Sequence, residues 1–221
     1  TSQMRSDIEA GRYTGWDDPR LPTLDALRMR GTQAEALRSF WLELGITQKD
    51  ISVPLATLYS HNTKVVDEDA PRLSFIRHPA RFILDGEYDA TVELPVHPND
   101  DTKGVRTWTI KDGAIWLESE DLAKMDVRLK EFADVALHDQ EARVESIERQ
   151  DQRPIIHWLP DHQSREVLLT TTKQNELIHI QGRLEPHAYP PGTVVQLERI
   201  GYARIMDDGN LVLSHEDLQD E

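Results

Sequence analysis

Apolar residues in the first third of the chain recur every three or four positions, which is the spacing of one face of an α-helix. Thr23 is a favourable N-cap residue and Gly31 a favourable residue just past a helix end, so a short helix is expected between them. Thr32 and Glu35 have capping-box spacing and predict the start of a second helix. Residues 1–70 are therefore expected to form a small helical bundle.

Three further sequence signals predict helices or turns within residues 1–70. An apolar stripe over residues 37–44 predicts an amphipathic helix that Gly45 ends. The segment Thr47-Gln48-Lys49-Asp50 repeats the signal of a helix start. Asp18-Pro19 is typical of a turn or a helix start, with Asp as cap and Pro in the first helical position.

From Leu73 onward the period of the apolar pattern changes from about four to two, which indicates β-strands. Many short strands with tight turns between them favour a barrel or a sandwich. The expected strands are Arg81–Leu84, Ala90–Val96, Arg106–Ile110, Ala114–Leu117, Val127–Leu129, Arg143–Ile147, Ile155–Leu159, Val167–Thr171, Leu177–Ile180, Val194–Ile200, Tyr202–Ile205 and Leu211–Leu213.

Turn residues separate several of these strands. Asp112-Gly113 lies between two alternating runs and predicts a β-hairpin. Asp207-Asp208-Gly209-Asn210 predicts another, and Pro190-Pro191-Gly192 breaks the chain before the last strands.

The composition of the 221 residues narrows the function classes. Because the chain has no cysteine, disulfides and thiolate zinc sites are excluded. No apolar run approaches the ~20 residues of a membrane span. The net charge of −15 argues against non-specific binding of nucleic acid, but the 18 arginines still allow specific contacts to bases and phosphates.

Catalytic and metal motifs are missing from the pattern. The nine histidines show no H-x-x-x-H or H-E-x-x-H spacing, and no phosphate-binding glycine loop is present. Asp17 and Asp18 are adjacent carboxylates, but neighbouring residues seldom bind one ion without further ligands, so we interpret them as a cap beside a buried Trp16. We therefore expect no metal site.

An ordered series of motifs gives the chain a family resemblance. It resembles the C-terminal half of archaeal and eukaryotic-type glutamyl-tRNA synthetases and of glutaminyl-tRNA synthetases, which are class I enzymes. The segments that carry this resemblance are Gly15–Gly31, Asp67–Arg72, Leu94–Pro98, Ile115–Leu117, Val127–Leu129, Ile155–Trp158 and Val195–Tyr202.

The resemblance implies a multi-domain layout, with helices first and two β-barrels after them. Residues 1–72 would be a helical connector along the inner face of the tRNA L. Residues 73–125 and 173–217 would form a proximal anticodon-binding β-barrel, into which a distal barrel of residues 126–172 is inserted. Residues 218–221 would be a tail.

The resemblance also implies the residues that contact RNA. The family's Ala-Pro-Arg and Gln-Phe-Glu-Arg motifs contact the middle anticodon base and match Arg72, Gln196 and Arg199, with leucine in place of the phenylalanine. The Val-Arg-Leu strand carries basic contacts to an outer anticodon base, which match Arg128 and Lys130. Unstacked bases expose edges that Arg and Gln can hydrogen-bond in a fixed plane.

By the same resemblance, Thr1 and Ser2 lie where the family ends its KMSKS-like ATP loop, and they are candidate remnants of it. No catalytic residue is expected in this chain, and the fragment is expected to be inactive alone. ATP with Mg²⁺ would serve the full enzyme, whose N-terminal catalytic domain would precede this chain.

The expected function is therefore the tRNA-binding part of a cytoplasmic glutamate–tRNA ligase, with tRNA(Glu) as partner and neither DNA nor membrane. Glutamate and glutamine anticodons share their middle base, so a glutaminyl-tRNA synthetase part stays open as an alternative. A stand-alone RNA-binding or docking module is the other alternative.

Overall fold

The computed structural model describes residues 2–45 and 52–216. The chain divides into two compact units. The first unit takes residues 1–71, 169–179 and 189–221, and the second takes residues 72–168 and 180–188. The signal at Thr47–Asp50 lies outside the described residues. No helix in the described part of the chain is long and apolar enough to cross a membrane.

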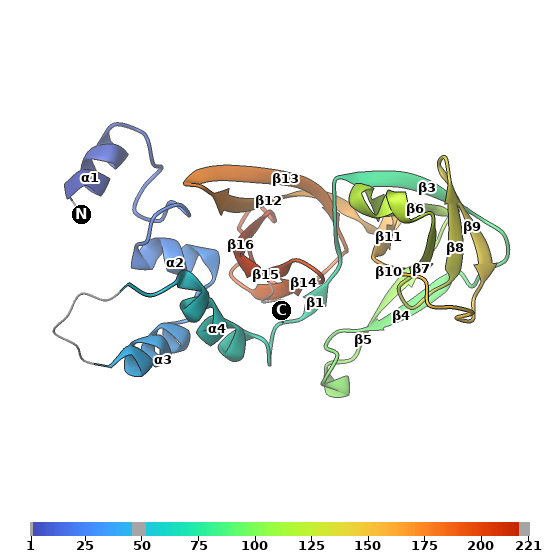
Figure 1. The fold of residues 1–221 in the computed structure, drawn as a ribbon, viewed down its shortest axis with the longest axis horizontal. Helices are drawn as coiled ribbons and strands as arrows, with labels where there is room; N and C mark the ends of the chain where they lie inside the picture. The colour runs from blue at the N-terminus through green and yellow to red at the C-terminus, as the bar shows by residue number, and fades with distance from the viewer. Residues whose placement is uncertain (1, 46–51, 217–221) are drawn as a thin grey trace. The chain divides into compact units, whose positions relative to one another are not determined.

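Three helix ends in the first unit lie where the sequence predicts them, and Figure 1 shows the helices themselves. Thr23 caps the second helix through a bond from the Ala26 N–H to its Oγ1 at 3.1 Å, and Gly31 ends it in the left-handed region with φ 98°. Gly45 ends the third. The helices of residues 2–45 and 52–71 are α1 (Ser2–Glu9), α2 (Leu24–Arg30), α3 (Ala34–Leu44) and α4 (Leu55–Val66).

The predicted capping box at Thr32 and Glu35 is wrong. The N-cap of α3 is Gln33, whose side chain makes no capping bond; it donates instead to the Gly31 carbonyl at 2.9 Å. The N–H of Gln33 donates to Oδ1 of buried Asn62 at 2.8 Å, so a side chain of α4 satisfies it. A tertiary contact replaces the local cap that the spacing suggested.

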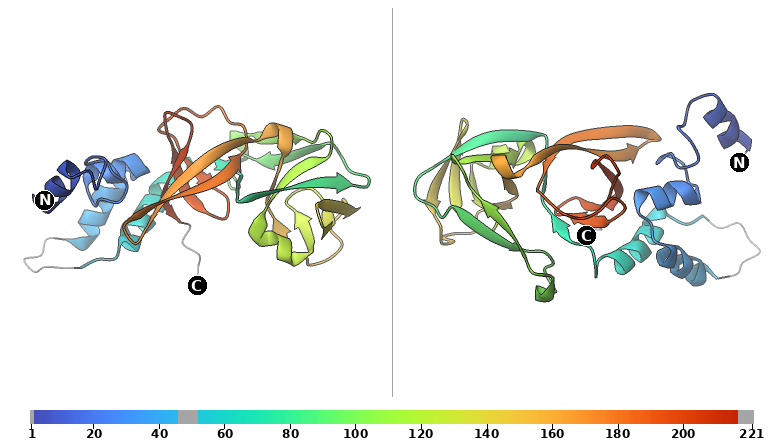
Figure 2. Two further views of the ribbon diagram at one scale, coloured as in Figure 1. Left: turned by 90° about the horizontal axis from the view of Figure 1, so that it is seen from above. Right: turned by 180° about the vertical axis from the view of Figure 1, so that it is seen from behind.

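The sheet of the first unit curves into a nearly closed barrel, drawn in orange and red in Figure 2. Its strand order is β14–β15–β16–β12–β13, and the predicted hairpin at 207–210 joins the antiparallel pair β15 and β16. The boundary between the two units falls within β12, after residue 168, and within β13, after residue 179. The bounds are β12 (Arg165–Lys173), β13 (Glu176–Leu184), β14 (Val194–Leu197), β15 (Gly201–Ile205) and β16 (Leu211–Glu216).

The second unit holds a second barrel-like sheet with the strand order β10–β7–β8–β9–β3–β6–β11. Its core is apolar: Trp158 is fully buried and contacts the Trp108 ring edge-on at 5.1 Å between centroids. The strands are β3 (Pro79–Asp85), β6 (Ala114–Glu118), β7 (Asp126–Leu129), β8 (Asp134–His138), β9 (Glu141–Ser146), β10 (Ile155–Ile156) and β11 (Trp158–Pro160).

Shorter elements complete the second unit. The end of β13 pairs antiparallel with β2, and β4 pairs antiparallel with β5 in a separate two-stranded sheet. The elements are β1 (Arg72–Leu73), β2 (Phe75–Arg77), β4 (Thr91–Pro95), β5 (Val105–Thr109) and the 3₁₀ turns η1 (Asp101–Lys103), η2 (Ser119–Lys124) and η3 (Asp161–Gln163).

The predicted hairpin at Asp112-Gly113 is wrong, because the flanking strands join different sheets. β5 pairs with β4, whereas β6 pairs with β3 and β11. The coarse fold prediction is confirmed: a few helices accompany two nearly closed, barrel-like sheets. The helical connector, the insertion of one barrel in the other and the bounds 1–72, 73–125, 126–172, 173–217 and 218–221 remain predictions.

Candidate nucleic-acid interface

Gln196 and Arg199 lie at the end of β14 in the first unit. The neighbours of Gln196, Val195 and Leu197, are fully buried, so strand alternation turns Gln196 to the opposite face, where it is half-buried. The chain then turns, and the Ile200 N–H donates to the Leu197 carbonyl at 3.0 Å. This arrangement puts a hydrogen-bonding side chain on a rigid strand at the edge of a turn.

Arg199 occupies that turn in the left-handed region, with φ 67°, and is exposed. A non-glycine residue there costs roughly 1–2 kcal/mol, so the surrounding structure must enforce the conformation. The Gly201–Ile205 strand that follows pairs with β14, and its Tyr202 faces Gln196 in the register. The turn is therefore short and fixed, which directs the guanidinium outward from a defined position.

The segment that precedes Arg72 is tied to the same strand. The N–H of Gln196 donates to the carbonyl of Pro71 at 3.0 Å. Asp67, the C-cap of α4, accepts a bond from the Tyr202 hydroxyl at 2.5 Å. The end of α4 and the Pro71 backbone are thus both anchored on β14 and β15.

Arg72 itself is the first residue of β1 and belongs to the second unit. It is buried, with 6% of its surface exposed, and its N–H donates to the Val96 carbonyl at 2.9 Å. Of the three residues predicted to read the middle base, Gln196 and Arg199 therefore share one unit, and Arg72 lies in the other.

Arg128 and Lys130 are placed by β7 and its end. Val127 and Leu129 are fully buried, while Arg128 and Lys130 are half-buried, which fits the prediction that the two basic residues share a face. The Lys130 N–H donates to the Ile156 carbonyl at 3.0 Å, and the Lys130 carbonyl accepts from the Trp158 indole at 3.0 Å. Backbone bonds therefore fix Lys130 although it lies past the last strand residue.

The Arg128 side chain makes three bonds inside its unit. Nη1 donates to Asp134 Oδ1 at 2.8 Å, and Nη2 donates to the carbonyls of Ile147 at 3.1 Å and Phe132 at 3.4 Å. Asp134 is fully buried, and its other oxygen accepts from the Gln150 N–H at 2.8 Å. Burial alone would raise the pKa of Asp134, but the Arg128 and Gln150 bonds lower it overall.

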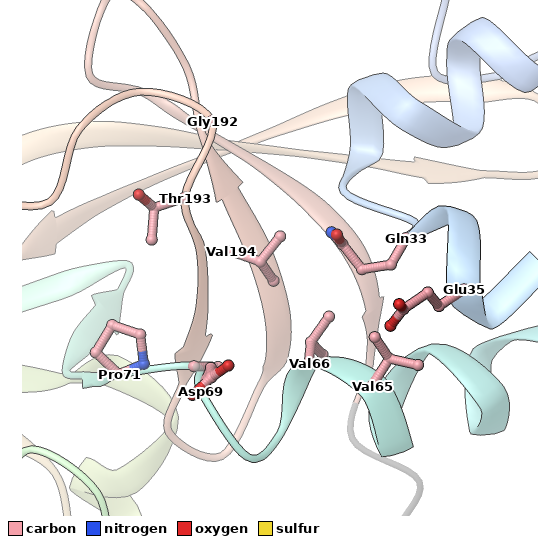
Figure 3. Close-up of a pocket in the computed structure, with 10 residues that line it drawn as sticks. Gln33, Glu35, Val65, Val66, Asp69, Pro71, Gly192, Thr193 and Val194 are labelled. Carbon is pink, nitrogen blue, oxygen red and sulfur yellow. The ribbon is translucent and has the colours of Figure 1, made fainter.

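A hollow of about 420 Å³ lies beside the Pro71 segment and the start of β14 (Figure 3). Val66 and Val194 line its apolar floor, and exposed Glu35 and Asp69 stand at its rim. Two carboxylates and no Lys or Arg at this rim disfavour a phosphate there. We therefore place the candidate interface on the β14 turn and not in this hollow.

The comparisons with known proteins decide the family. A family model described as "tRNA synthetases class I (E and Q), anti-codon binding domain" matches residues 70–153, and a second model with the same description matches residues 155–206. The chain belongs to the class I tRNA synthetases (E and Q). The matched residues include Arg72, Arg128, Lys130, Gln196 and Arg199, so every predicted contact lies in an anticodon-binding domain of this family.

Several curated relatives of the chain are archaeal glutamate–tRNA ligases. The chain is 38% identical over 215 residues to the glutamate–tRNA ligase of Archaeoglobus fulgidus, a match that covers 93% of this chain and 37% of that protein. It is 36% identical to that of Methanosarcina acetivorans (72% of this chain, 30% of that protein) and 34% identical to that of Pyrococcus furiosus (92% and 38%). The chain thus spans less than two fifths of these relatives.

The synthetase resemblance also predicted remnants of an ATP loop. Ser2 is the first residue of α1, which has no buried residue, and Thr1 lies outside the described residues. Within residues 2–45 and 52–216, no group of three or more His, Cys, Asp or Glu side chains could hold a metal ion. The remnant interpretation remains a prediction.

The Trp16-Asp17-Asp18 segment differs from its prediction in one respect. Asp18 is buried and caps its loop, as expected, but Trp16 is 39% exposed. The reason is that Asp18 takes the inward position and binds the N–H groups of Thr14 and Arg20, each at 3.0 Å. A pattern of residue types cannot show which of two neighbours in a loop turns inward.

Proposed function

We propose that this chain is the anticodon-binding part of a glutamate–tRNA ligase and that it binds tRNA(Glu). The longer protein would activate glutamate with ATP and Mg²⁺ and transfer it to the tRNA, in the cytoplasm where translation takes place. The observation that carries the proposal is the match of two anticodon-binding models to adjacent parts of a chain whose curated relatives are glutamate–tRNA ligases. Their names favour glutamate over the glutaminyl alternative.

We propose that Arg72, Gln196 and Arg199 recognise the middle base of the anticodon. The Gln196 amide can donate and accept in one plane, and the Arg199 guanidinium adds a fork of donors from a fixed turn. Both groups can hydrogen-bond the exposed edge of an unstacked base in one plane. Such contacts also explain how a chain of net charge −15 can bind RNA, since recognition then relies on a few placed groups.

The test is Arg199→Ala, because this side chain is exposed and its loss leaves the core intact. We expect binding of tRNA(Glu) to weaken by ~1–3 kcal/mol, and binding of a tRNA with another middle anticodon base to change much less. The matched control is Arg143→Ala, which removes an exposed arginine from β9. Equal losses on both tRNAs would contradict base recognition by Arg199.

We further propose that Arg128 and Lys130 act at an outer anticodon base. The bonds of Arg128 to Asp134 and Ile147 would then serve to orient its guanidinium, and Lys130 would add a positive charge on the same face. We also propose that the chain forms no glutamyl-adenylate alone. Glutamate-dependent ATP–pyrophosphate exchange by the purified chain would overturn that last point.

A further inference from the structure

A second hollow in the first unit has the chemistry of a nucleotide site. Its volume is about 390 Å³, within the range of small-molecule sites. One aromatic ring, two guanidinium groups and two carboxylates line it. The lining residues are Trp16, Asp17, Asp25, Arg28, Met29 and Arg204.

The loop that presents Trp16 is held rigidly. Buried Asp18 binds Arg20 through Nε at 2.9 Å and Nη2 at 2.7 Å, in addition to its two backbone bonds. The Arg20 guanidinium also donates to the Arg12 carbonyl at 2.8 Å. The Trp16 carbonyl accepts from the Thr23 hydroxyl, which itself caps α2. The backbone that carries the exposed Trp16 ring is therefore fixed, which gives a stacking surface a defined place.

The two arginines are positioned but carry no ion pair. Arg204 of β15 donates from Nη1 to the Met29 carbonyl at 3.3 Å, and Arg28 projects from α2 as an exposed side chain. Within residues 2–45 and 52–216, neither Arg28 nor Arg204 forms an ion pair with a carboxylate, whereas Arg20 in the neighbouring loop pairs with Asp18. The two guanidinium groups of this hollow are therefore open to the phosphate of a ligand.

We propose that this hollow binds one unpaired ribonucleotide of the bound RNA. The base would stack on Trp16, and the phosphate would lie between Arg28 and Arg204. Asp17 and Asp25 would accept hydrogen bonds from the ribose hydroxyls or base amino groups, and their charge would disfavour a simple anion. The proposal rests on the proposed function, since it assigns a second contact on the same tRNA, away from Gln196 and Arg199.

The test compares binding of a tRNA(Glu) transcript by the whole chain and by single variants. We expect Trp16→Ala to weaken binding by about tenfold, because one stacked base is lost, and Trp16→Phe to restore most of it. Arg28→Gln and Arg204→Gln should each weaken binding and lower the slope of affinity against salt concentration by about one. The control Arg38→Gln removes an exposed arginine from α3 and should change neither quantity.

Two comparisons separate this proposal from anticodon recognition. The Trp16 and Arg28 variants should lose the same factor on tRNA(Glu) and on a tRNA with another middle base, whereas Arg199→Ala should not. If the Trp16, Arg28 and Arg204 variants, folded by circular dichroism, bind within twofold of the unaltered chain while Arg199→Ala still discriminates, the hollow is no RNA site and the proposed function stands. If the unaltered chain does not bind tRNA(Glu), both proposals fail.

Discussion

The hydroxyl of Tyr202 donates a hydrogen bond to Oδ1 of Asp67 at 2.5 Å, across 135 residues of sequence. Tyr202 is buried on β15, and Asp67 is the C-cap of α4. Val66 and Ala70 pack against the same tyrosine. This single side chain therefore fixes the end of a helix to the barrel strand that pairs with Gln196.

Tyr202→Phe keeps the packing of the ring and removes the hydroxyl that donates to Asp67. Because the acceptor is a carboxylate, we expect the free energy of unfolding to fall by ~1.5–3 kcal/mol. Urea denaturation measures it. Tyr13→Phe is the control, since its hydroxyl accepts an exposed bond from Asn175 at 3.0 Å, and it should cost much less. A loss for Tyr202→Phe no larger than the control's would mean that solvent replaces the Asp67 bond.

Tyr202 also forms one side of a stack around His215. The imidazole lies between the rings of Tyr59, at 5.3 Å, and Tyr202, at 5.0 Å, and its Nε2 lies 2.8 Å from the Thr63 hydroxyl. Burial first, and the nearby Arg30 charge second, lower the pKa of His215 to about 4. The imidazole is therefore neutral in the folded chain under conditions where it would be charged in the unfolded chain.

Stability should depend on pH through this histidine. Between pH 6.5 and 4 the unfolded chain binds the proton and the folded chain does not, so the free energy of unfolding falls as pH falls. The stabilisation is fully present above pH 6.5 and decreases towards pH 4, by at most about 3 kcal/mol. His215→Gln should flatten the slope between pH 6.5 and 5, and His179→Gln, at an exposed site, should not. An unchanged slope in His215→Gln would assign the dependence to other groups.

Helix ends were predictable from sequence because caps are local. Thr23 lies at an N-cap, where its hydroxyl accepts a backbone N–H, and Gly31 and Gly45 lie just past helix ends at positive φ, which glycine adopts readily. Strand pairing was not predictable from turn residues alone. Asp112-Gly113 has the composition of a hairpin turn, yet long-range pairing sends the flanking strands to two different sheets. Strand β8 was missed because its apolar run is short and begins with Asp134.

The sequence predicted which residues make up the candidate site. It did not predict their backbone conformation or their side-chain contacts. The motif containing Gln196 and Arg199 identified the segment, and strand alternation predicts that Gln196 opposes buried neighbours. The left-handed backbone of Arg199 and the pairing of Arg128 with Asp134 depend on contacts with residues that sequence spacing does not bring together. The exposure of Trp16 likewise follows from the inward turn of Asp18.

Gly31 shows how a helix end and the barrel constrain one residue together. Its φ of 98° favours glycine, and a Cβ there would lie 2.9 Å from Val194 Cγ2. We expect Gly31→Ala to lower the free energy of unfolding by more than the ~1 kcal/mol of the backbone effect alone. Gly11→Ala is the control, because Gly11 also has a positive φ, 73°, and a Cβ there would have no atom within 4 Å. Equal losses in thermal denaturation would show that the Val194 contact relaxes without cost.

The Arg128–Asp134 pair decides how variants at the predicted anticodon contacts must be interpreted. Arg128→Ala would leave the fully buried Asp134 carboxylate with only its Gln150 bond. Breaking such a pair costs ~3–5 kcal/mol, so we expect a large loss of stability from Arg128→Ala, measured by urea denaturation. Arg143→Ala removes an exposed arginine from the same unit and should stay within about 0.5 kcal/mol.

Arg128→Ala combined with Asp134→Asn should recover part of that loss, since the buried charge is then gone. If the double variant is folded and still binds tRNA(Glu) weakly, Arg128 contributes to RNA contact directly. If the double variant binds like the unaltered chain, Arg128 serves only to hold β7, β8 and the Ile147 carbonyl in place. Stability and tRNA affinity are measured on Arg128→Ala, Arg143→Ala and the double variant. Together they separate a contact of Arg128 to RNA from a contact within the fold.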